Sequence, residues 1–284
     1  MTTLRSLVVE EAGGLVTVQD RGRPGLAHLG VPRAGALDAP AAALGNRLVG
    51  NDEDAAVLET TMSALVLRAT GPCWLAVTGA RCAITVDGRA VAHAEAVWVP
   101  RDGMVRVGAP EDGVRGYLAV SGGIGVAPVL GSRSTDTLAW VGPPRVVEGS
   151  ELPVGRPTGT PAAYEAPRAP RSGPLRVHPG PRTDWFADDA LRRLCASPYT
   201  VTEASNRVGL RLEGPVLERV RHDELPSEGM VLGAVQVPPD GRPVVFLADH
   251  PTTGGYPVLA VVHADDLWRC AQLRPGDRIG FSAA

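Results

Sequence analysis

The chain has 284 residues, of which 28 are basic and 31 acidic, and its formal net charge is −3. This length fits two domains or one large β domain, and the slight negative charge without a basic stripe argues against a nucleic-acid partner. All the basic residues are arginine. A Schiff-base lysine, a Walker A phosphate loop and the lysine of a biotin or lipoyl carrier are therefore excluded. Any bound anion must be held by arginine, backbone amides or a helix N-terminus.

Targeting and metal-binding patterns are weak. The N-terminus does not resemble a signal peptide and no apolar run approaches about 18 residues, which predicts a soluble, cytoplasmic protein. Cys73, Cys82, Cys195 and Cys270 lack a CxxC spacing, and this indicates buried thiols in a reducing compartment. The six histidines are scattered, so no metal site is expected.

Short apolar runs punctuated by glycine or proline predict a mainly β protein with a few short helices. In the N-terminal half the runs are 15–18, 64–67, 74–77, 83–86, 96–99 and 114–120. In the C-terminal half they are 175–177, 199–202, 210–212, 230–237, 244–247, 258–262 and 278–281. Such spacing suits a sandwich or barrel better than alternating βαβ units.

Three segments predict helices, and one segment predicts a domain boundary. The helices are 39–48, preceded by Asp38 as N-cap, then 188–194, and 264–273 with two aspartates in its first turn. Residues 155–174 contain five prolines, a composition typical of an extended linker. We therefore expect an N-terminal β-rich domain at 1–155, a linker at 156–174 and a C-terminal domain at 175–284.

Residues 249–257, Asp-His-Pro-Thr-Thr-Gly-Gly-Tyr-Pro, are the most informative segment. They join two apolar runs, so a strand is expected to enter a rigid turn and leave as a second strand. Two prolines restrict the backbone, and the glycine pair allows conformations closed to other residues. One interpretation is a well-capped hairpin loop. The other is a binding or catalytic site, because five side chains in the segment can form hydrogen bonds.

Other polar residues lie next to predicted strands and have two interpretations each. Asp20 and Arg33 lie in glycine- and proline-containing loops, where binding groups concentrate. Asn206 and Arg207 suit either a turn with a solvated arginine or a binding site, and Glu228 suits either a hairpin or a catalytic carboxylate. Glu59 follows an apolar run as an edge charge, and Gln236 ends the strong run at 230–235. The segment 121–125, Ser-Gly-Gly-Ile-Gly, lacks the third glycine and the βαβ context of a dinucleotide site.

Taken in order, these motifs resemble one family. They are Val18-Gln-Asp-Arg-Gly-Arg23, Gly30-Val-Pro-Arg-Ala-Gly-Ala-Leu-Asp38, Asn46-Arg47, Leu58-Glu59, Gly122-Gly-Ile124, Leu130-Gly-Ser-Arg-Ser-Thr-Asp136, Ser205-Asn-Arg-Val-Gly-Leu-Arg211, Ser227-Glu-Gly229, Gly233-Ala-Val-Gln-Val-Pro238 and residues 249–257. The chain resembles the KipA family, whose members are also known as the C component of 5-oxoprolinase or as allophanate hydrolase subunit 2. It is also similar to one half of the carboxyltransferase domain of urea carboxylase.

The resemblance implies two cyclophilin-like β-barrel subdomains and a protein that works together with a KipI-like subunit. With a third, LamB/YcsF-like subunit, the family opens 5-oxoproline to glutamate using ATP. Some members are known as regulators that relieve a KipI-type inhibitor. Two features depart from the family: Ala34 stands where many relatives carry serine, and 139–150 differ from the usual glycine-rich stretch.

Three hypotheses follow for the function. The first is a subunit of an ATP-dependent 5-oxoprolinase acting on a small cyclic amide. The second is a biotin-dependent carboxyltransferase component acting on a urea-like substrate, with biotin on a separate carrier. The third is a non-catalytic regulator that binds a KipI-like protein. Because a Walker A loop is absent, whether ATP contacts this chain stays open.

The chemistry of the first hypothesis assigns roles to the candidate residues. A carboxylate would orient or deprotonate the nucleophile, and the candidates are Asp20, Glu228 and Asp249. Arginine and backbone amides would stabilise the developing oxyanion, and hydroxyl and amide groups would fix the substrate. The candidate substrate-binding residues are Arg33, Glu59, Asn206, Arg207, Gln236, His250, Thr252, Thr253 and Tyr256.

Overall fold

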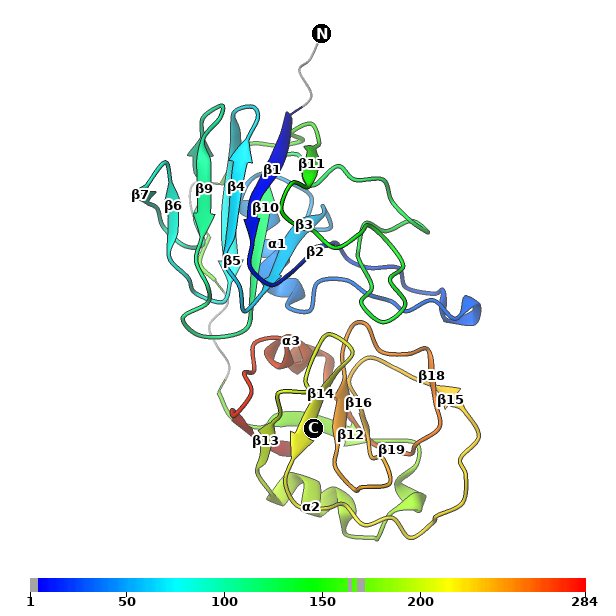
Figure 1. Cartoon of the computed structure of the whole chain (residues 1–284). Helices are drawn as coiled ribbons and strands as arrows, with labels where there is room; N and C mark the ends of the chain where they lie inside the picture. Colours follow the sequence, from blue (N-terminus) through cyan, green and yellow to red (C-terminus); the bar gives the residue numbers. More distant parts are fainter. Residues whose placement is uncertain (1–4, 163–164, 168–171) are drawn as a thin grey trace. The chain divides into compact units, whose positions relative to one another are not determined.

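The computed structural model describes residues 5–162, 165–167 and 172–284, which form two compact units (Figure 1). The first unit comprises the described residues of Met1–Arg23, Ala34–Thr135 and Trp140–Ala169. The second comprises Pro24–Arg33, Asp136–Ala139 and the described residues of Pro170–Ala284. The predicted domain limits stay predictions, and residues 1–4, 163–164 and 168–171, the last two within the predicted linker, lie outside the described residues.

The first unit contains two antiparallel sheets that share one apolar core. The six-stranded sheet has the order β11 (Glu151–Val154), β1 (Arg5–Ala12), β4 (Leu65–Ala69), β9 (Met104–Val107), β6 (Ile84–Val86) and β7 (Arg89–Ala90). The five-stranded sheet has the order β2 (Leu15–Gln19), β3 (Val57–Thr61), β10 (Arg115–Val120), β5 (Cys73–Gly79) and β8 (Val97–Val99). Alternating apolar side chains of both sheets fill the core, as the period of two in a β-strand requires.

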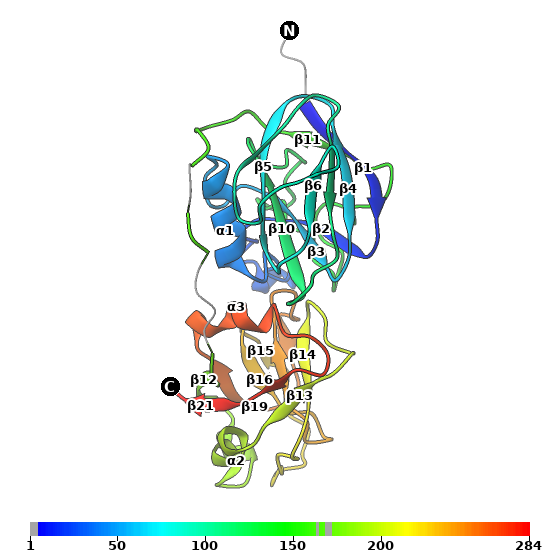
Figure 2. The same ribbon diagram turned by 90° about the vertical axis from the view of Figure 1, so that its left-hand side faces the viewer.

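Helix α1 (Ala39–Leu48) packs against β5 and β10 of the five-stranded sheet (Figure 2). Its apolar residues join a second small core with Tyr117 and Ala119 of β10. Strand β10 is buried along its whole length, because the shared core covers one face of the sheet and the helix covers the other. The helix matches its predicted range, and the predicted cap is confirmed: Asp38 Oδ1 accepts a hydrogen bond from Ala41 N at 3.1 Å.

The second unit is built on one eight-stranded sheet that curls into a nearly closed barrel. Its order is β20 (Arg278–Ile279), β13 (Tyr199–Val201), β14 (Gly209–Glu213), β17 (Val244–Phe246), β16 (Ala234–Gln236), β19 (Val258–Val262), β12 (Leu175–Pro179) and β21 (Phe281–Ala283). The two edge strands, β20 and β21, are separated in sequence by Gly280 alone. The sheet must therefore curve until its two edges approach each other.

The remaining elements of the second unit are short. A two-stranded ribbon pairs β15 (Glu228–Gly229) with β18 (Thr253–Gly254). The α-helices are α2 (Ala190–Ala196) and α3 (Leu267–Cys270), and the 3-10 turns are η1 (Ala27–Leu29), η2 (Thr183–Trp185) and η3 (Ala264–Asp266). The mainly β architecture with a few short helices is thus confirmed. Among the described residues, no helix has the length and apolar character needed to cross a bilayer.

Three expectations differ from the structure. The hairpin interpretation of 249–257 is wrong, because β16 lies between β17 and β19 and pairs with both. The run 230–237 contains a strand only at 234–236, since Gly233 turns the chain with a φ of 84°. The expected helix 264–273 is a 3-10 turn followed by α3, which ends at Cys270.

The N-cap of α1 gives a stability prediction. Asp38→Ala removes the acceptor for Ala41 N and is expected to lower the free energy of unfolding by about 1 kcal/mol, whereas Asp38→Asn keeps an acceptor and most of the stability. Urea unfolding measures both, with the exposed Asp52→Ala as the comparison. An unchanged urea midpoint for Asp38→Ala would show that the cap contributes nothing.

Candidate functional site

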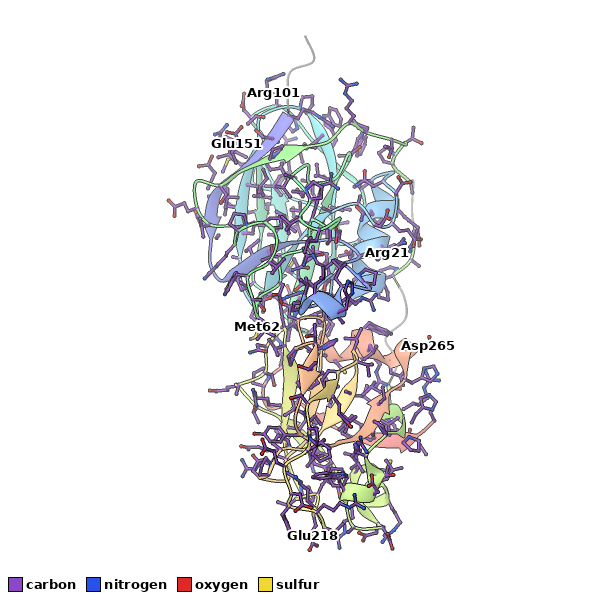
Figure 3. All side chains as sticks on the ribbon, turned by 90° about the vertical axis from the view of Figure 1, so that its right-hand side faces the viewer. Arg21, Met62, Arg101, Glu151, Glu218 and Asp265 are labelled. Atoms are coloured by element: carbon purple, nitrogen blue, oxygen red, sulfur yellow. The ribbon has the colours of Figure 1, made fainter. Side chains whose placement is uncertain are left out.

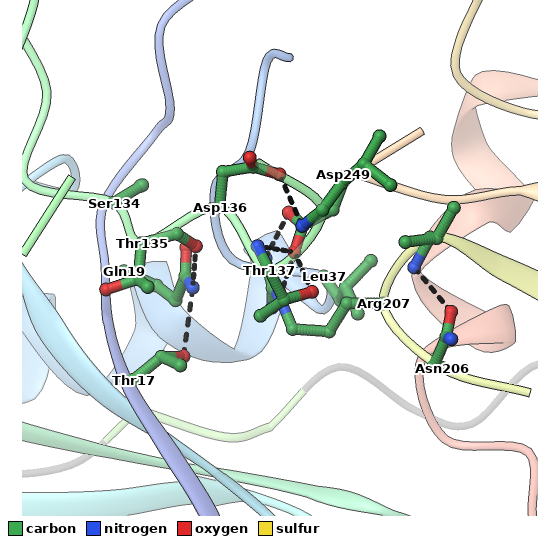
Figure 4. Close-up of polar contacts among 12 residues, drawn as sticks. Thr17, Gln19, Leu37, Ser134, Thr135, Asp136, Thr137, Asn206, Arg207 and Asp249 are labelled. Carbon is green, nitrogen blue, oxygen red and sulfur yellow. Dashed lines mark hydrogen bonds and ion pairs between the residues drawn. The ribbon is translucent and has the colours of Figure 1, made fainter. Parts of the chain in front are cut away.

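A buried ion pair anchors the segment 249–257 in the second unit. Arg207 Nε donates to Asp249 Oδ2 at 2.8 Å and Arg207 Nη2 donates to Oδ1 at 3.0 Å. The two side chains are 1% and 0% exposed. Thr137 donates twice to Oδ2, from its backbone N at 2.9 Å and from Oγ1 at 2.7 Å (Figure 4). The backbone N of Asp249 also donates to the carbonyl of Arg207 at 3.1 Å.

This arrangement favours a positioning role for Asp249. Its carboxylate accepts four hydrogen bonds from buried or half-buried donors, and its side chain has no exposed surface. A carboxylate held in this way fixes the chain on either side of it. The predicted catalytic role of Asp249 stays a prediction, as does substrate binding by Arg207, which the structure places inside the unit rather than in a solvated turn.

His250 directly follows the anchored aspartate and is 7% exposed. Its Nδ1 lies 2.7 Å from the carbonyl oxygen of Pro251. Because a carbonyl only accepts, Nδ1 carries the proton, and in the neutral ring Nε2 carries the lone pair. Burial lowers the pKa of His250, and the positive charge of Arg33 lowers it further. The imidazole is therefore neutral near pH 7, with Nε2 as a proton acceptor.

The ribbon of β15 and β18 carries a second carboxylate. Glu228 pairs in register with Gly254, and Met230 N donates to the carbonyl of Thr252 at 2.9 Å. Arg182 binds both oxygens of Glu228, with Nε at 3.0 Å from Oε2 and Nη2 on Oε1. These hydrogen bonds lower the pKa of Glu228. Glu228 is thus an ionised carboxylate whose side chain is 26% exposed.

Gln236 holds the far end of the segment. Its Nε2 donates to the carbonyl of Tyr256 at 3.1 Å. A Cβ atom on Gly254 would lie 2.8 Å from the same nitrogen, so a larger residue there would displace the amide. The Tyr256 and Thr253 side chains are exposed and Thr252 is half-buried, which leaves a hydroxyl-rich surface on a fixed backbone.

The second unit contains ten of the twelve predicted site residues, and the first unit holds the other two. Asn206 belongs to the second unit through its local turn, where Oδ1 accepts from Val208 N at 2.8 Å and Gly209 N at 3.2 Å. Its turn interpretation is confirmed, and substrate binding by it stays a prediction. Arg33 is exposed and lies close enough to influence the charge state of His250.

Asp20 and Glu59 form two separate networks in the first unit. Asp20 Oδ1 accepts from the hydroxyls of Ser132 and Ser134, each at 2.6 Å, and Oδ2 accepts from Arg133 N at 2.6 Å. Glu59 is fully buried rather than an edge charge. It accepts from Tyr117 Oη at 2.9 Å and from Leu37 N at 3.1 Å. Glu59 thus fixes the segment before α1, and substrate binding by it stays a prediction.

Several residues that form these contacts have no feature in the sequence that would predict their role. Thr137 and Arg182 contact their partners over 112 and 46 residues of chain. Tyr117 lies in an ordinary strand pattern. The one available clue was the polar character of Gln19 and Asp20 at the end of an apolar run.

In a comparison with known proteins, both units match one domain family. The model of the carboxyltransferase domain, subdomain A and B, matches residues 29–283. The C component of 5-oxoprolinase from Escherichia coli is 37% identical over 97% of this chain and 90% of its own length. This chain belongs to the carboxyltransferase domain A and B family. The resemblance noted in the sequence is therefore confirmed.

Solved structures share the fold of this carboxyltransferase-family chain. TTHA0988 is 40% identical with a TM-score of 0.89, and the match covers 100% of this chain and 56% of that one. The K. lactis urea amidolyase is 30% identical with a TM-score of 0.91, over 98% of this chain and 18% of that one. The chain thus spans about half, or less, of these solved proteins.

The buried ion pair gives a second prediction. Arg207→Met leaves the Asp249 carboxylate buried without its cation and is expected to cost about 3–5 kcal/mol of stability. The double variant with Asp249→Leu should regain part of that loss, because no buried charge remains. Thermal and urea unfolding measure both, and Arg211→Met, at an exposed position of β14, is the matched control. A double variant no more stable than Arg207→Met would contradict the assigned cause.

His250 gives a third prediction. NMR titration of the imidazole should show a pKa below 6.5, since burial disfavours the charged ring. Arg33→Gln should raise that pKa, because it removes a cation that disfavours imidazolium, whereas Arg192→Gln, at an exposed position of α2 in the same unit, should leave it unchanged. A pKa that does not respond to Arg33→Gln would remove Arg33 from the surroundings of His250.

Proposed function

We propose that this chain is one subunit of an ATP-dependent 5-oxoprolinase, working with KipI-like and LamB/YcsF-like subunits to open 5-oxoproline to glutamate. The observation that carries the proposal is the similarity to the C component of the Escherichia coli 5-oxoprolinase along nearly the whole of both chains. The chain has no lysine and hence no Walker A loop, so the residues here do not fit a phosphate-loop ATP site. ATP is assigned to the complex, and no step on this chain depends on it.

The reaction adds water across the cyclic amide. A bond forms between the carbonyl carbon and the water oxygen, the ring C–N bond breaks, and the leaving nitrogen gains a proton. In this proposal His250 Nε2 takes a proton from the attacking water, since it carries the lone pair of a neutral ring. Arg33 stabilises the developing negative oxygen, and ionised Glu228 orients a donor group of the substrate.

The fixed segment supports these roles by limiting motion. The Arg207–Asp249 pair holds one end of the segment, and the Gln236 amide holds the other. The exposed hydroxyls of Thr253 and Tyr256 lie between these anchors and would hydrogen-bond the substrate. A preformed backbone avoids the loss of conformational entropy when the substrate binds.

A second candidate function is carboxyl transfer in a biotin-dependent system. It is favoured by the similarity to the K. lactis urea amidolyase over 98% of this chain. Because the chain has no lysine, biotin would be carried by a separate protein. A urea-like substrate would use the same arginine and hydroxyl groups.

Reconstitution tests the proposal. Glutamate release from 5-oxoproline and ATP hydrolysis should require all three subunits and stop when this chain is omitted. His250→Asn should lower kcat by about 10²–10⁴, as expected for loss of a general base, while Glu203→Gln at an exposed turn should not. Assembly of the three subunits without turnover would overturn the oxoprolinase proposal. It would favour carboxyl transfer if carboxybiotin supports reaction, and a regulatory role if it does not.

A further inference from the structure

The connection from β10 to β11 is long for a segment without regular structure. Strand β10 ends at Val120 and β11 begins at Glu151, and residues 121–150 contain only isolated β-bridges. Figure 1 draws this connection in green to the right of the sheets, and Figure 3 shows that side of the first unit. Such long irregular loops are usually either functional or disordered. Its parts 121–135 and 140–150 belong to the first unit.

A buried arginine holds these two parts of the connection together. Arg23 is 3% exposed. Its Nη2 donates to the carbonyl of Ser134, and its Nε donates to the carbonyl of Val129 at 3.4 Å. A Cβ atom on Gly142 would lie 2.1 Å from the same Ser134 oxygen and 3.1 Å from Arg23 Nη2. The turn that contains Gly142 therefore packs on the turn that contains Val129, and the connection is ordered rather than loose.

Leu130 lies at the tip of the first of these turns. Val129 and Ser132 exchange both backbone hydrogen bonds, at 2.8 and 3.2 Å, and Leu130 and Gly131 between them have φ angles of 50° and 81°. Positive φ at both central residues is the mark of a type I′ turn, which favours the pair Asn-Gly. A leucine is strained there, because its Cβ crowds the backbone in the left-handed region. Leu130 is nevertheless 51% exposed, so burial within the unit does not compensate for the strain.

Trp140 shows the same combination of strain and exposure in the second turn. Its φ is 56° and it is 55% exposed. Positive φ is an outlier for so bulky a residue. Val129, beside Leu130, is also exposed. Val129, Leu130 and Trp140 form an apolar patch, since Arg23 joins the two turns that carry them. Backbone strain that packing does not explain points to a function for these side chains.

The relatives of this chain indicate what covers such a patch. The Escherichia coli relative is the C component of 5-oxoprolinase, hence one part of a larger assembly. In TTHA0988 the match to this chain covers only 56% of that chain, so further polypeptide accompanies the same fold there. A chain that serves as a separate component needs a non-covalent interface with such a part. Exposed tryptophan is the residue type most enriched among the energetically dominant residues of protein interfaces.

We propose that the apolar patch of Val129, Leu130 and Trp140 is the surface on which the KipI-like subunit docks. The identity of this partner rests on the proposed function, whereas the location of the surface rests on the strained and exposed side chains. Trp140 is the aromatic anchor of the interface, and Leu130 packs against the partner beside it. Asparagine or glycine would relax the backbone at either position but would not supply the apolar contact, which explains why the strain is retained.

Leu130→Asn separates docking from stability. Because Asn-Gly is the favoured type I′ pair, the full-length variant should unfold at the same temperature as the wild type or higher. Titration calorimetry should show binding of the KipI-like subunit weakened about tenfold or more. Met62→Asn is the matched control, since Met62 also has a positive φ, of 46°, and is 50% exposed in the same unit (Figure 3). Unchanged binding by Leu130→Asn, or equal weakening by Met62→Asn, would overturn the docking surface.

Trp140→Ala tests the anchor and the identity of the partner. It should weaken binding of the KipI-like subunit about tenfold or more, with circular dichroism as the check on folding. Trp98→Ala, which removes a 48% exposed indole from β8 of the same unit, should leave binding unchanged. Sedimentation of this chain alone and titration with the LamB/YcsF-like subunit test the other occupants. If Trp140→Ala abolishes self-association or LamB/YcsF-like binding and spares KipI-like binding, the assigned partner is wrong.

The three-subunit assay separates this inference from the proposed function. Excess KipI-like subunit should restore 5-oxoproline turnover to both patch variants, because the patch acts in assembly and not on the substrate. Turnover by the wild-type complex, together with unchanged binding by both variants, would overturn the docking surface and leave the oxoprolinase proposal standing. Binding that depends on Leu130 and Trp140, with no turnover by the assembled complex, would overturn the proposed function and leave the docking surface standing.

Discussion

The buried pair of Arg207 and Asp249 is the constraint on which the candidate site in the second unit depends. Removing two charges from water is costly, and a well-packed apolar pair is often as stable. What the ion pair provides is direction, because the guanidinium and carboxylate meet along two parallel hydrogen bonds. The backbone N of Leu247 also donates to the carbonyl of Val208. The chain entering β14 is thus joined to the chain leaving β17, and His250 is placed as a consequence.

The segment after His250 is held at several points along its length. Thr253 pairs with Gly229 in the β15–β18 ribbon, and the carbonyl of Pro257 accepts from Val237 N at 3.0 Å. Without these contacts, the segment that connects β17 to β19 past β16 would be a long loop with many conformations. Each anchor is a backbone or buried contact, so the exposed side chains of Thr253 and Tyr256 remain available. Rigid backbone with free polar side chains is the combination that a binding site needs.

The features that could be predicted from the sequence are those set by interactions between residues close together in the chain. Helix α1 was located because its cap, proline and apolar spacing lie within a few residues of one another. The turn role of Asn206 was also available, since an Asx turn is a local hydrogen bond. The order of the strands could not be predicted from the sequence, because β16 pairs with both β17 and β19 and no local pattern encodes these pairings. The buried ion pair of Arg207 could not be predicted either, because its partner lies 42 residues away in the chain.

The acidic side chains show why residue type alone does not assign a role. Asp249 is saturated with hydrogen bonds and enclosed, and Asp20 is held by the hydroxyls of Ser132 and Ser134. Glu228 is ionised and partly exposed, but Arg182 makes it a weak base. A general base needs a lone pair within reach of the substrate and a pKa near the working pH. His250 meets that need better than any of the three carboxylates, because burial lowers its pKa and keeps the ring neutral near pH 7, and the Pro251 carbonyl fixes its proton on Nδ1. The aspartate beside it then acts through position, by setting where that ring lies.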